Sequence, residues 1–218
     1  TTTNFTITPH HHRLLTALLL SHACSDFCLI GGKGVGKSAL IRHFSRQLGY
    51  APSIVPLYKD MSARDLLQRR TTDLAGNTQW DNSSLVTCAL EGGLAVLDGI
   101  EQLPYGTLGT LTRLLNDREA NLPDGSRLVP TWRYDAMVKE CGQERVDQSG
   151  VRAVHGGFRV VACARPGRVA TWLTAEGLGM FHFHYMRPLS DTVRGNWRER
   201  KGKYSIVCDI ILCDDIVY

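Results

Sequence analysis

The amino-acid sequence predicts an α/β fold in which a parallel β-sheet is flanked by helices. Short apolar runs, typical of buried strands, alternate along the chain with segments whose apolar residues recur at helical spacing. A glycine-rich segment, GGKGVGKS, joins one such run to one such helix at residues 31–38. A later apolar run ends in a carboxylate, Asp98. Because ligands of parallel sheets bind at the carboxyl ends of the strands, we expect both features at one binding edge.

The first strand and its neighbouring helices are predicted from the N-terminal part of the chain. Residues 10–21 carry a leucine-rich face at helical spacing and predict an amphipathic helix. Residues 26–30, DFCLI, form a short apolar run suited to a buried strand. After the glycine-rich segment, apolar residues recur at helical spacing as far as Leu48, and Gly49 is a typical helix stop. The glycine-rich segment therefore connects a strand to a helix N-terminus.

The next stretch predicts a second strand and two further helices. Residues 53–58, SIVPLY, read as a strand. Residues 62–68 predict a short helix capped by its first residue, a serine. Residues 76–83 are polar and rich in turn-forming residues, so we expect a loop there. Residues 84–91 predict a helix that ends at the glycine pair 92–93.

The remaining elements alternate in the same way. Residues 94–98, LAVLD, predict a buried strand, and residues 105–116 predict a helix by the spacing of their leucines. Residues 121–130 contain Pro-Asp-Gly between apolar residues, which favours a hairpin. Residues 158–164, FRVVACA, predict another buried strand, and residues 181–186 are the last strand candidate.

The glycine-rich segment fits G-x-x-x-x-G-K-[ST], the pattern of a phosphate-binding loop. Gly31 and Gly36 allow backbone angles that other residues avoid, so successive N–H groups can cradle phosphate oxygens. Lys37 can reach the β- and γ-phosphates of a nucleotide, and the Ser38 hydroxyl can bind Mg²⁺. The predicted nucleotide-binding residues are Gly31, Gly32, Lys33, Gly34, Val35, Gly36, Lys37, Ser38 and Ala39. The predicted ligands are ATP or ADP, with Mg²⁺.

Asp98 is the predicted second magnesium residue, because a carboxylate at the end of a buried strand can hold the ion through water. Lys37 and Asp98 are the first candidate catalytic residues. Hydrolytic proteins with this loop commonly place Glu directly after the aspartate, whereas this chain has Gly99. Glu101 is a third catalytic candidate, and its alternative interpretation is a solvated residue at a helix start. We expect Gly99→Glu to raise turnover if the rest of the site is intact.

Several other polar residues have a functional and a structural interpretation. The run His10-His11-His12 could bind a metal, but a solvated helix start is the simpler reading. His182 and His184 share a strand face and are read as structural. A set of arginines could touch phosphate or a neighbouring subunit, with solvated helix faces as the default: Arg64, Arg69, Arg70 and Arg113.

Composition narrows the classes of function. The chain has 218 residues, a formal net charge of +4 and one short basic stretch at residues 194–203, which argues against a nucleic-acid ATPase. Its seven cysteines are odd in number and lack a C-x-x-C pattern, so we expect free thiols in a reducing compartment. No run approaches about 18 apolar residues, so we expect no membrane span. The first residue is Thr1, so the sequence does not test for a targeting peptide.

The ordered motifs resemble AAA+ proteins of the dynein-related, midasin and MoxR kind. The resemblance covers residues 27–191. The chain has no N-K-x-D motif, which argues against a GTPase, no L-S-G-G-Q motif, which argues against an ABC transporter, and no D-E-A-D motif, which argues against that helicase group. The motifs that carry the resemblance follow one another in the family's order: GGKGVGKS, DMSARDLLQRR at 60–70, WDNSSLVTCALEGG at 80–93, LAVLDGIEQLP at 94–104, LLNDREANLPDG at 114–125 and GGFRVVACARPG at 156–167.

The resemblance implies an AAA+ core over residues 1–190, a helical lid that is missing, and an atypical tail over residues 191–218. It implies ATP hydrolysis coupled to conformational work, in a ring completed by other AAA+ modules or subunits. WRYDAMVKE at residues 132–140, together with several motifs above, is similar to a large multi-module mitochondrial member of the family. That similarity implies a module of a longer protein and a mitochondrial location.

Three positions depart from the family pattern. Gly99 occupies the position of the family's catalytic glutamate, and Arg165 lies near the position of its sensor asparagine. The family's arginine finger should fall just before Phe181, where the sequence reads GLGM. The sequence therefore leaves two hypotheses open. The chain is an active ATPase module, or it is a structural module that holds nucleotide with little or no hydrolysis.

Overall fold

The structure, a computed structural model, describes residues 9–72, 76–168 and 175–188. Its centre is a five-stranded sheet in the order β10-β1-β9-β5-β2, in which every neighbouring pair is parallel. The strands are β1 (Phe27–Gly31), β2 (Ser53–Pro56), β5 (Leu94–Asp98), β9 (Arg159–Ala164) and β10 (His182–Met186). The predicted parallel sheet is therefore confirmed, and each strand predicted outside the hairpin of residues 121–130 lies within it.

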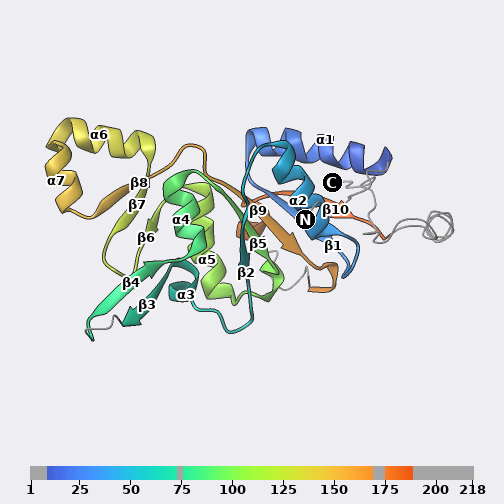
Figure 1. The fold of residues 1–218 in the computed structure, drawn as a ribbon, viewed down its shortest axis with the longest axis horizontal. Helices are drawn as coiled ribbons and strands as arrows, with labels where there is room; N and C mark the ends of the chain where they lie inside the picture. The colour runs from blue at the N-terminus through green and yellow to red at the C-terminus, as the bar shows by residue number, and fades with distance from the viewer. Residues whose placement is uncertain (1–8, 73–75, 169–174, 189–218) are drawn as a thin grey trace.

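Helices cover both faces of this sheet (Figure 1). One apolar cluster joins α1 (Pro9–Cys24) and α2 (Lys37–Gln47) to one face through residues such as Leu18, Phe44 and Phe27. The other joins α4 (Ser84–Glu91) and α5 (Tyr105–Asn116) to the opposite face. Side chains of a strand alternate between the faces, so Phe27 and Leu29 of β1 enter one cluster, and Cys28 and Ile30 enter the other.

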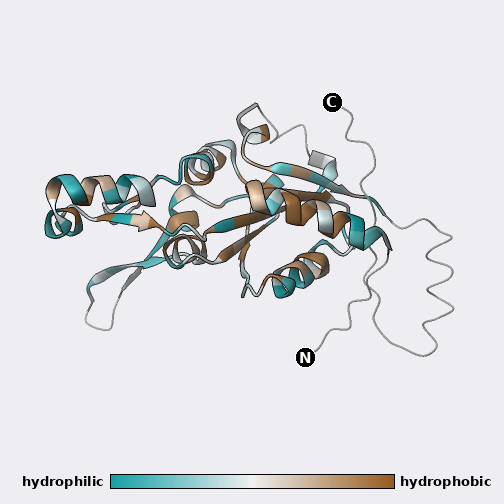
Figure 2. Ribbon diagram, turned by 90° about the horizontal axis from the view of Figure 1, so that it is seen from above, coloured by the Kyte–Doolittle hydropathy of each residue, from teal (hydrophilic) through white to brown (hydrophobic). Residues whose placement is uncertain are grey.

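Hydropathy follows this layering. Figure 2 shows hydrophobic strands in the middle of the molecule and mixed colours along the helices that cover them. Strands β1 and β9 are buried almost throughout, as parallel strands between two helical layers must be. Asp98 differs, because it is the exposed last residue of the otherwise buried β5. This pattern places a carboxylate at the carboxyl edge of the sheet, as the sequence predicted.

A second set of elements lies at one end of the molecule, on the left in Figure 1. It contains a three-stranded sheet of β6 (Ala120–Asn121), β7 (Arg127–Pro130) and β8 (Val151–Val154), with α6 (Thr131–Cys141) and α7 (Gln143–Gln148) between β7 and β8. A separate hairpin pairs β3 (Gln68–Thr72) with β4 (Thr78–Asn82). The predicted hairpin of residues 121–130 is confirmed, because β6 and β7 pair antiparallel.

The expectation of a loop at residues 76–83 is wrong. Residues Thr78–Asn82 form β4, and the strand β3 begins directly after the short helix α3 (Ala63–Leu67). Both strands consist mostly of exposed polar residues, QRRTT and TQWDN. An exposed hairpin of this kind has no apolar alternation, so the pattern that reveals buried strands is missing.

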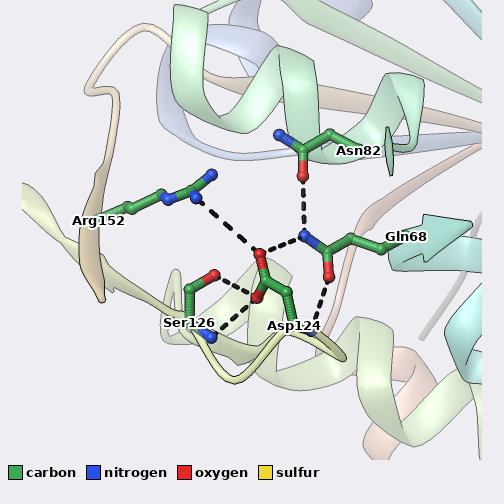
Figure 3. Close-up of polar contacts among 5 residues, drawn as sticks. All are labelled: Gln68, Asn82, Asp124, Ser126 and Arg152. Atoms are coloured by element: carbon green, nitrogen blue, oxygen red, sulfur yellow. Dashed lines mark hydrogen bonds and ion pairs between the residues drawn. The ribbon is translucent and has the colours of Figure 1, made fainter. Parts of the chain in front are cut away.

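A buried glutamine joins this hairpin to the turn between β6 and β7 (Figure 3). Gln68, 1% exposed, donates through Nε2 to Asn82 Oδ1 and to Asp124 Oδ2, each at 2.9 Å. Its Oε1 accepts from the Asp124 backbone N–H at 3.0 Å. Asp124 also accepts from the backbone and hydroxyl of Ser126, and Arg152 lies 3.9 Å away. Both donors on the Gln68 amide nitrogen and its amide oxygen therefore have a partner.

Two expectations about the end of the chain fall outside the described residues. The atypical tail, residues 191–218, lies beyond residue 188, as does any helical lid that would follow β10. Within the described part, Cys28, Cys88 and Cys163 are buried free thiols, and Cys24 and Cys141 are exposed free thiols. Among the described helices, none is long and apolar enough to cross a bilayer.

Candidate functional site

A cavity of about 480 Å³ opens at the carboxyl edge of the central sheet. Three parts of the chain meet there: the glycine-rich loop with the start of α2, the ends of β2 and β5, and the end of β9. The lining residues are Lys33, Gly34, Gly36, Lys37, Ser38, Ala39, Arg42, Pro56, Leu57, Asp98, Gly99, Glu101, Gln102, Cys163, Ala164 and Arg165. The sequence-predicted residues of the loop and of β5 are therefore brought together.

The other predicted loop residues, Gly31, Gly32 and Val35, do not line the cavity. Val35 is 7% exposed and belongs to the apolar cluster under α1 and α2. Gly31 ends β1 beside β10, and a Cβ there would meet the Met186 carbonyl oxygen at 3.0 Å. Gly34 and Gly36 have φ angles of 83° and 100°, which side chains rarely allow. These glycines are thus required by the loop's shape.

Lys37 closes the loop on itself. Its Nζ donates to the carbonyl oxygen of Gly32 at 2.8 Å and also to that of Gly31. Burial lowers the pKa of Lys37, while the negative charges of Asp98 and Glu101 act in the opposite direction. A partly desolvated ammonium group gains free energy from an anion more than an exposed one does. The position therefore favours a phosphate group within reach of Nζ.

The N-terminus of α2 presents its backbone to the same cavity. Its N-cap is Gly36, which has no side chain to accept from the first N–H groups of the helix. Ser38 lies in this first turn and is exposed in the cavity. Uncapped N–H groups and the positive end of the helix dipole both favour an anion here.

Asp98 faces this helix start from β5. It lies in register with Pro56 of β2 and Cys163 of β9, so the neighbouring strands end at the same level. A hydroxyl and a carboxylate at one cavity fit Mg²⁺, which prefers oxygen ligands and keeps several waters. Within the described residues, no group of three or more His, Cys, Asp or Glu could hold a metal by itself. Ser38 and Asp98 suit an ion that also takes phosphate oxygens as ligands.

Gly99 adopts a left-handed conformation with φ 90° and starts the 3-10 turn η1 (Ile100–Gln102). Its N–H donates to Cys163 O at 3.0 Å, and its carbonyl accepts from Gln102 N at 2.9 Å. A Cβ at this position would lie 2.5 Å from Gln102 Nε2. The backbone at this position favours glycine, so Gly99→Glu would add strain to the turn, which the expectation of raised turnover leaves out.

Glu101 is not a solvated helix-start residue, contrary to the simpler of the two sequence interpretations. Its side chain is 3% exposed, and its Oε1 lies 3.7 Å from Nε of Arg165. Within the described residues, Oε2 has no hydrogen-bond partner. The sequence suggested an exposed residue because Glu101 follows a strand end, where most carboxylates face solvent. The turn at Gly99 instead directs Glu101 into the cavity.

Four polar lining residues were not found from the sequence as parts of the site: Arg42, Gln102, Cys163 and Arg165, the last of which was only placed near the family's sensor position. Arg42 had a recognisable signal, because it lies four residues after Ser38 on α2 and so shares its helix face. Gln102 and Cys163 had none, since their places depend on the turn at Gly99 and on strand order. Burial raises the pKa of Cys163 to about 12, so its thiol stays protonated.

The structure agrees with one interpretation of the histidines and contradicts another. The sequence predicts a solvated helix start at residues 10–12, and this is wrong for His11, which is only 2% exposed. His184 is structural as expected, because its Nε2 shares a 2.8 Å hydrogen bond with Ser21 Oγ and its ring packs edge-on against Phe27. Two of the four arginines, Arg69 and Arg70, lie on strand β3 and not on a helix face.

Residues 26–176 match the family described as AAA domain (dynein-related subfamily). The chain is similar to von Willebrand factor A domain-containing protein 8 of Mus musculus, with 43% identity over 192 residues. That alignment covers 85% of this chain and 10% of the mouse protein, so the chain spans about a tenth of that relative's length.

A shorter sequence match and a match to a solved structure were also found. Denitrification regulatory protein NirQ of Stutzerimonas stutzeri is 31% identical over 88 residues, which are 40% of this chain and 32% of NirQ. The solved structure of a candidate ATPase from Cytophaga hutchinsonii superposes with a TM-score of 0.61 at 10% identity, over 93% of this chain and 54% of that one. The fold is shared, and the chain belongs to the dynein-related subfamily of the AAA+ ATPase family.

Proposed function

We propose that this chain is a nucleotide-binding AAA+ module that binds Mg-ATP in the 480 Å³ cavity and hydrolyses it. The backbone of the loop from Gly31 to Ala39 holds the phosphates, and Lys37 contacts the β- and γ-phosphates. Ser38 and Asp98 hold Mg²⁺, the latter through water. Bound there, Mg²⁺ would supply charge neutralisation at the phosphate oxygens. The observation that carries the proposal is the meeting of Lys37, Ser38 and Asp98 at one cavity.

Hydrolysis is coupled to conformational work in an assembly with other AAA+ modules or subunits. Such neighbours would supply the arginine that the sequence before Phe181 lacks, and would so raise the turnover that the chain has alone. The partners are ATP, ADP and these neighbouring modules, and nucleic acid has no part in the proposal because the net charge is only +4. A mitochondrial location stays a prediction from sequence resemblance alone.

A second candidate function is a structural module that retains nucleotide without turnover. Gly99 favours it, because no carboxylate follows Asp98 directly. Ligand at 100 times its Kd would add about 2.7 kcal/mol of stability, which is a sufficient use for an intact loop. Both functions need the same binding site, so they differ in phosphate release and not in affinity.

Calorimetric titration of Lys37→Ala with Mg-ATP tests the shared part of both proposals. The wild type is expected to bind, and Lys37→Ala is expected to lose at least about tenfold in affinity, equivalent to about 1.4 kcal/mol. Lys139→Ala is the matched control, because Lys139 is exposed on α6 and does not line the cavity. Equal affinity in wild type and Lys37→Ala would contradict the proposed site.

A further inference from the structure

A buried carboxylate in the nucleotide cavity has an oxygen without a partner. Glu101 lines the cavity with Lys37, Ser38 and Asp98, yet its side chain is 3% exposed. Its Oε2 finds no hydrogen bond within the described residues, and its Oε1 has only Arg165 at 3.7 Å. A carboxylate this buried is normally paired or bonded at both oxygens, because burial without partners costs free energy. A function at Oε2 accounts for this cost.

The turn before Glu101 explains how it reaches the cavity. Gly99 has φ 90°, and it is held by hydrogen bonds to β9 and within η1. The turn η1 follows Asp98 and Gly99 directly, and its residue Glu101 lines the same cavity as Asp98. A Cβ at position 99 would lie 2.5 Å from Gln102 Nε2, so the Gln102 side chain would have to move, and the φ of 90° would strain any residue other than glycine. Glycine at 99 and glutamate at 101 are therefore two parts of one arrangement.

We propose that Glu101 performs the water-orienting role in ATP hydrolysis, and that Arg165 is the residue that positions it. This inference rests on the proposed function, because it assigns a residue to the hydrolysis step of the same site. The geometry on which it stands is the shared cavity, the bare Oε2 and the 3.7 Å contact with Arg165. The charges of Glu101 and Arg165 both act on the pKa of Lys37, which agrees with their closeness to the loop.

Oε2 of Glu101 accepts a hydrogen bond from a water molecule whose oxygen attacks the γ-phosphorus of ATP. A bond forms between the water oxygen and phosphorus, and the bond between phosphorus and the β–γ bridging oxygen breaks. ADP leaves with that oxygen and its electron pair. The proton of the water passes to Glu101 and then to solvent, and inorganic phosphate is released.

Arg165 contributes by orientation. It follows the end of β9, is 59% exposed, and lines the same cavity. Its guanidinium carries a fixed charge, so it holds Oε1 and leaves Oε2 directed at the water. Arg165 is therefore a positioning residue, and its effect should pass through Glu101.

The test uses the full 218-residue chain and three measurements: Mg-ATP affinity by calorimetry, phosphate release, and the identity of nucleotide extracted after incubation. Glu101→Gln has nearly the same shape, and it should lower turnover about 100-fold or more. Affinity should stay within about threefold, and the extracted nucleotide should remain ATP instead of ADP. Glu91→Gln is the control, because Glu91 is exposed at the end of α4, before β5, and does not line the cavity.

Arg165→Ala tests the positioning role. It should lower turnover in the wild-type background, and it should cause no further loss in the Glu101→Gln background, because a positioning residue needs its target. Equal losses in both backgrounds would contradict the positioning role. Gly99→Glu should lower turnover, since it disturbs the turn that places Glu101, and an increase would contradict the arrangement.

The outcomes separate this inference from the proposed function. If the wild type and Glu101→Gln hydrolyse ATP equally fast, the role of Glu101 is overturned while the ATPase stands. If the wild type binds Mg-ATP without phosphate release, the role of Glu101 falls with hydrolysis, and the structural function takes its place. If Glu101→Gln loses binding as well, the residue is structural and not catalytic. Loss of binding only in Lys37→Ala supports the site itself.

Discussion

His11 is a residue whose surroundings change its chemistry. It lies on α1, and only 2% of its surface is exposed. Burial lowers the pKa of His11 to about 4, and the neighbouring His10, His43 and His12 add to the effect. A histidine with a depressed pKa remains neutral in the folded protein at pH values where the unfolded chain has already bound a proton.

The lowered pKa of His11 predicts that the free energy of unfolding falls as the pH is lowered. Above about pH 6.5, His11 is neutral in both states and has no effect on the free energy of unfolding. Between about pH 6.5 and 4, the unfolded chain binds the proton and the folded chain does not, so stability falls by up to about 1.4 kcal/mol per pH unit. The pKa values of His22, His43 and His184 are shifted in the same direction.

Urea denaturation at pH 7.5 and pH 5 measures the effect. His11→Leu should reduce the loss of stability between the two pH values, and His12→Leu should reduce it by a smaller amount, because the exposed His12 is only the smallest of the causes that lower the pKa of His11. The same loss in His11→Leu and in wild type would show that His11 does not titrate as described.

At the scale of elements, the β3–β4 hairpin depends on one buried side chain. Gln68 of β3 donates a hydrogen bond to Asn82 of β4 within the hairpin. It donates a second one to Asp124, in the turn between β6 and β7 (Figure 3). Burial acts against ionisation of Asp124, but hydrogen bonds from Ser126 and Gln68 hold its pKa below the usual value. Removing Gln68 would leave a partly buried carboxylate and amide with fewer partners, which typically costs about 1–3 kcal/mol.

Gln68→Ala is therefore expected to lower the free energy of unfolding by about 1–3 kcal/mol, as measured by urea denaturation. Gln79→Ala is the matched control, because it removes the same side chain from an exposed position on the partner strand β4. Its effect should stay within about 0.5 kcal/mol. Equal effects of the two substitutions would contradict the connecting role of Gln68.

The elements also show what the sequence could reveal. Strands β1, β5 and β9 are buried on both faces, so they appear as continuous apolar runs and were predicted. The hairpin of β3 and β4 was missed because its residues are polar and its main partner, Asp124, is distant in sequence. Helices α6 and α7 were also missed, since α6 buries no residue and α7 buries only Val146.

At the scale of the whole molecule, the order β10-β1-β9-β5-β2 brings the glycine-rich loop, Asp98 and the end of β9 to one edge. The sequence predicted the loop and Asp98 because each follows its own strand. It could not predict the burial of Glu101, which depends on the left-handed turn at Gly99 and on Arg165 from another strand. Site residues that follow directly from the local sequence could be predicted, whereas contacts between separate segments of the chain could not.

The central claim is that this cavity is the Mg-ATP site. A crystal structure of the chain with Mg²⁺ and a non-hydrolysable ATP analogue tests it most directly. The phosphates are predicted to lie along the loop at residues 31–38 within reach of Lys37, with the metal ion beside Ser38 and Asp98. Nucleotide bound at any other surface, or a metal ion remote from Asp98, would contradict the account.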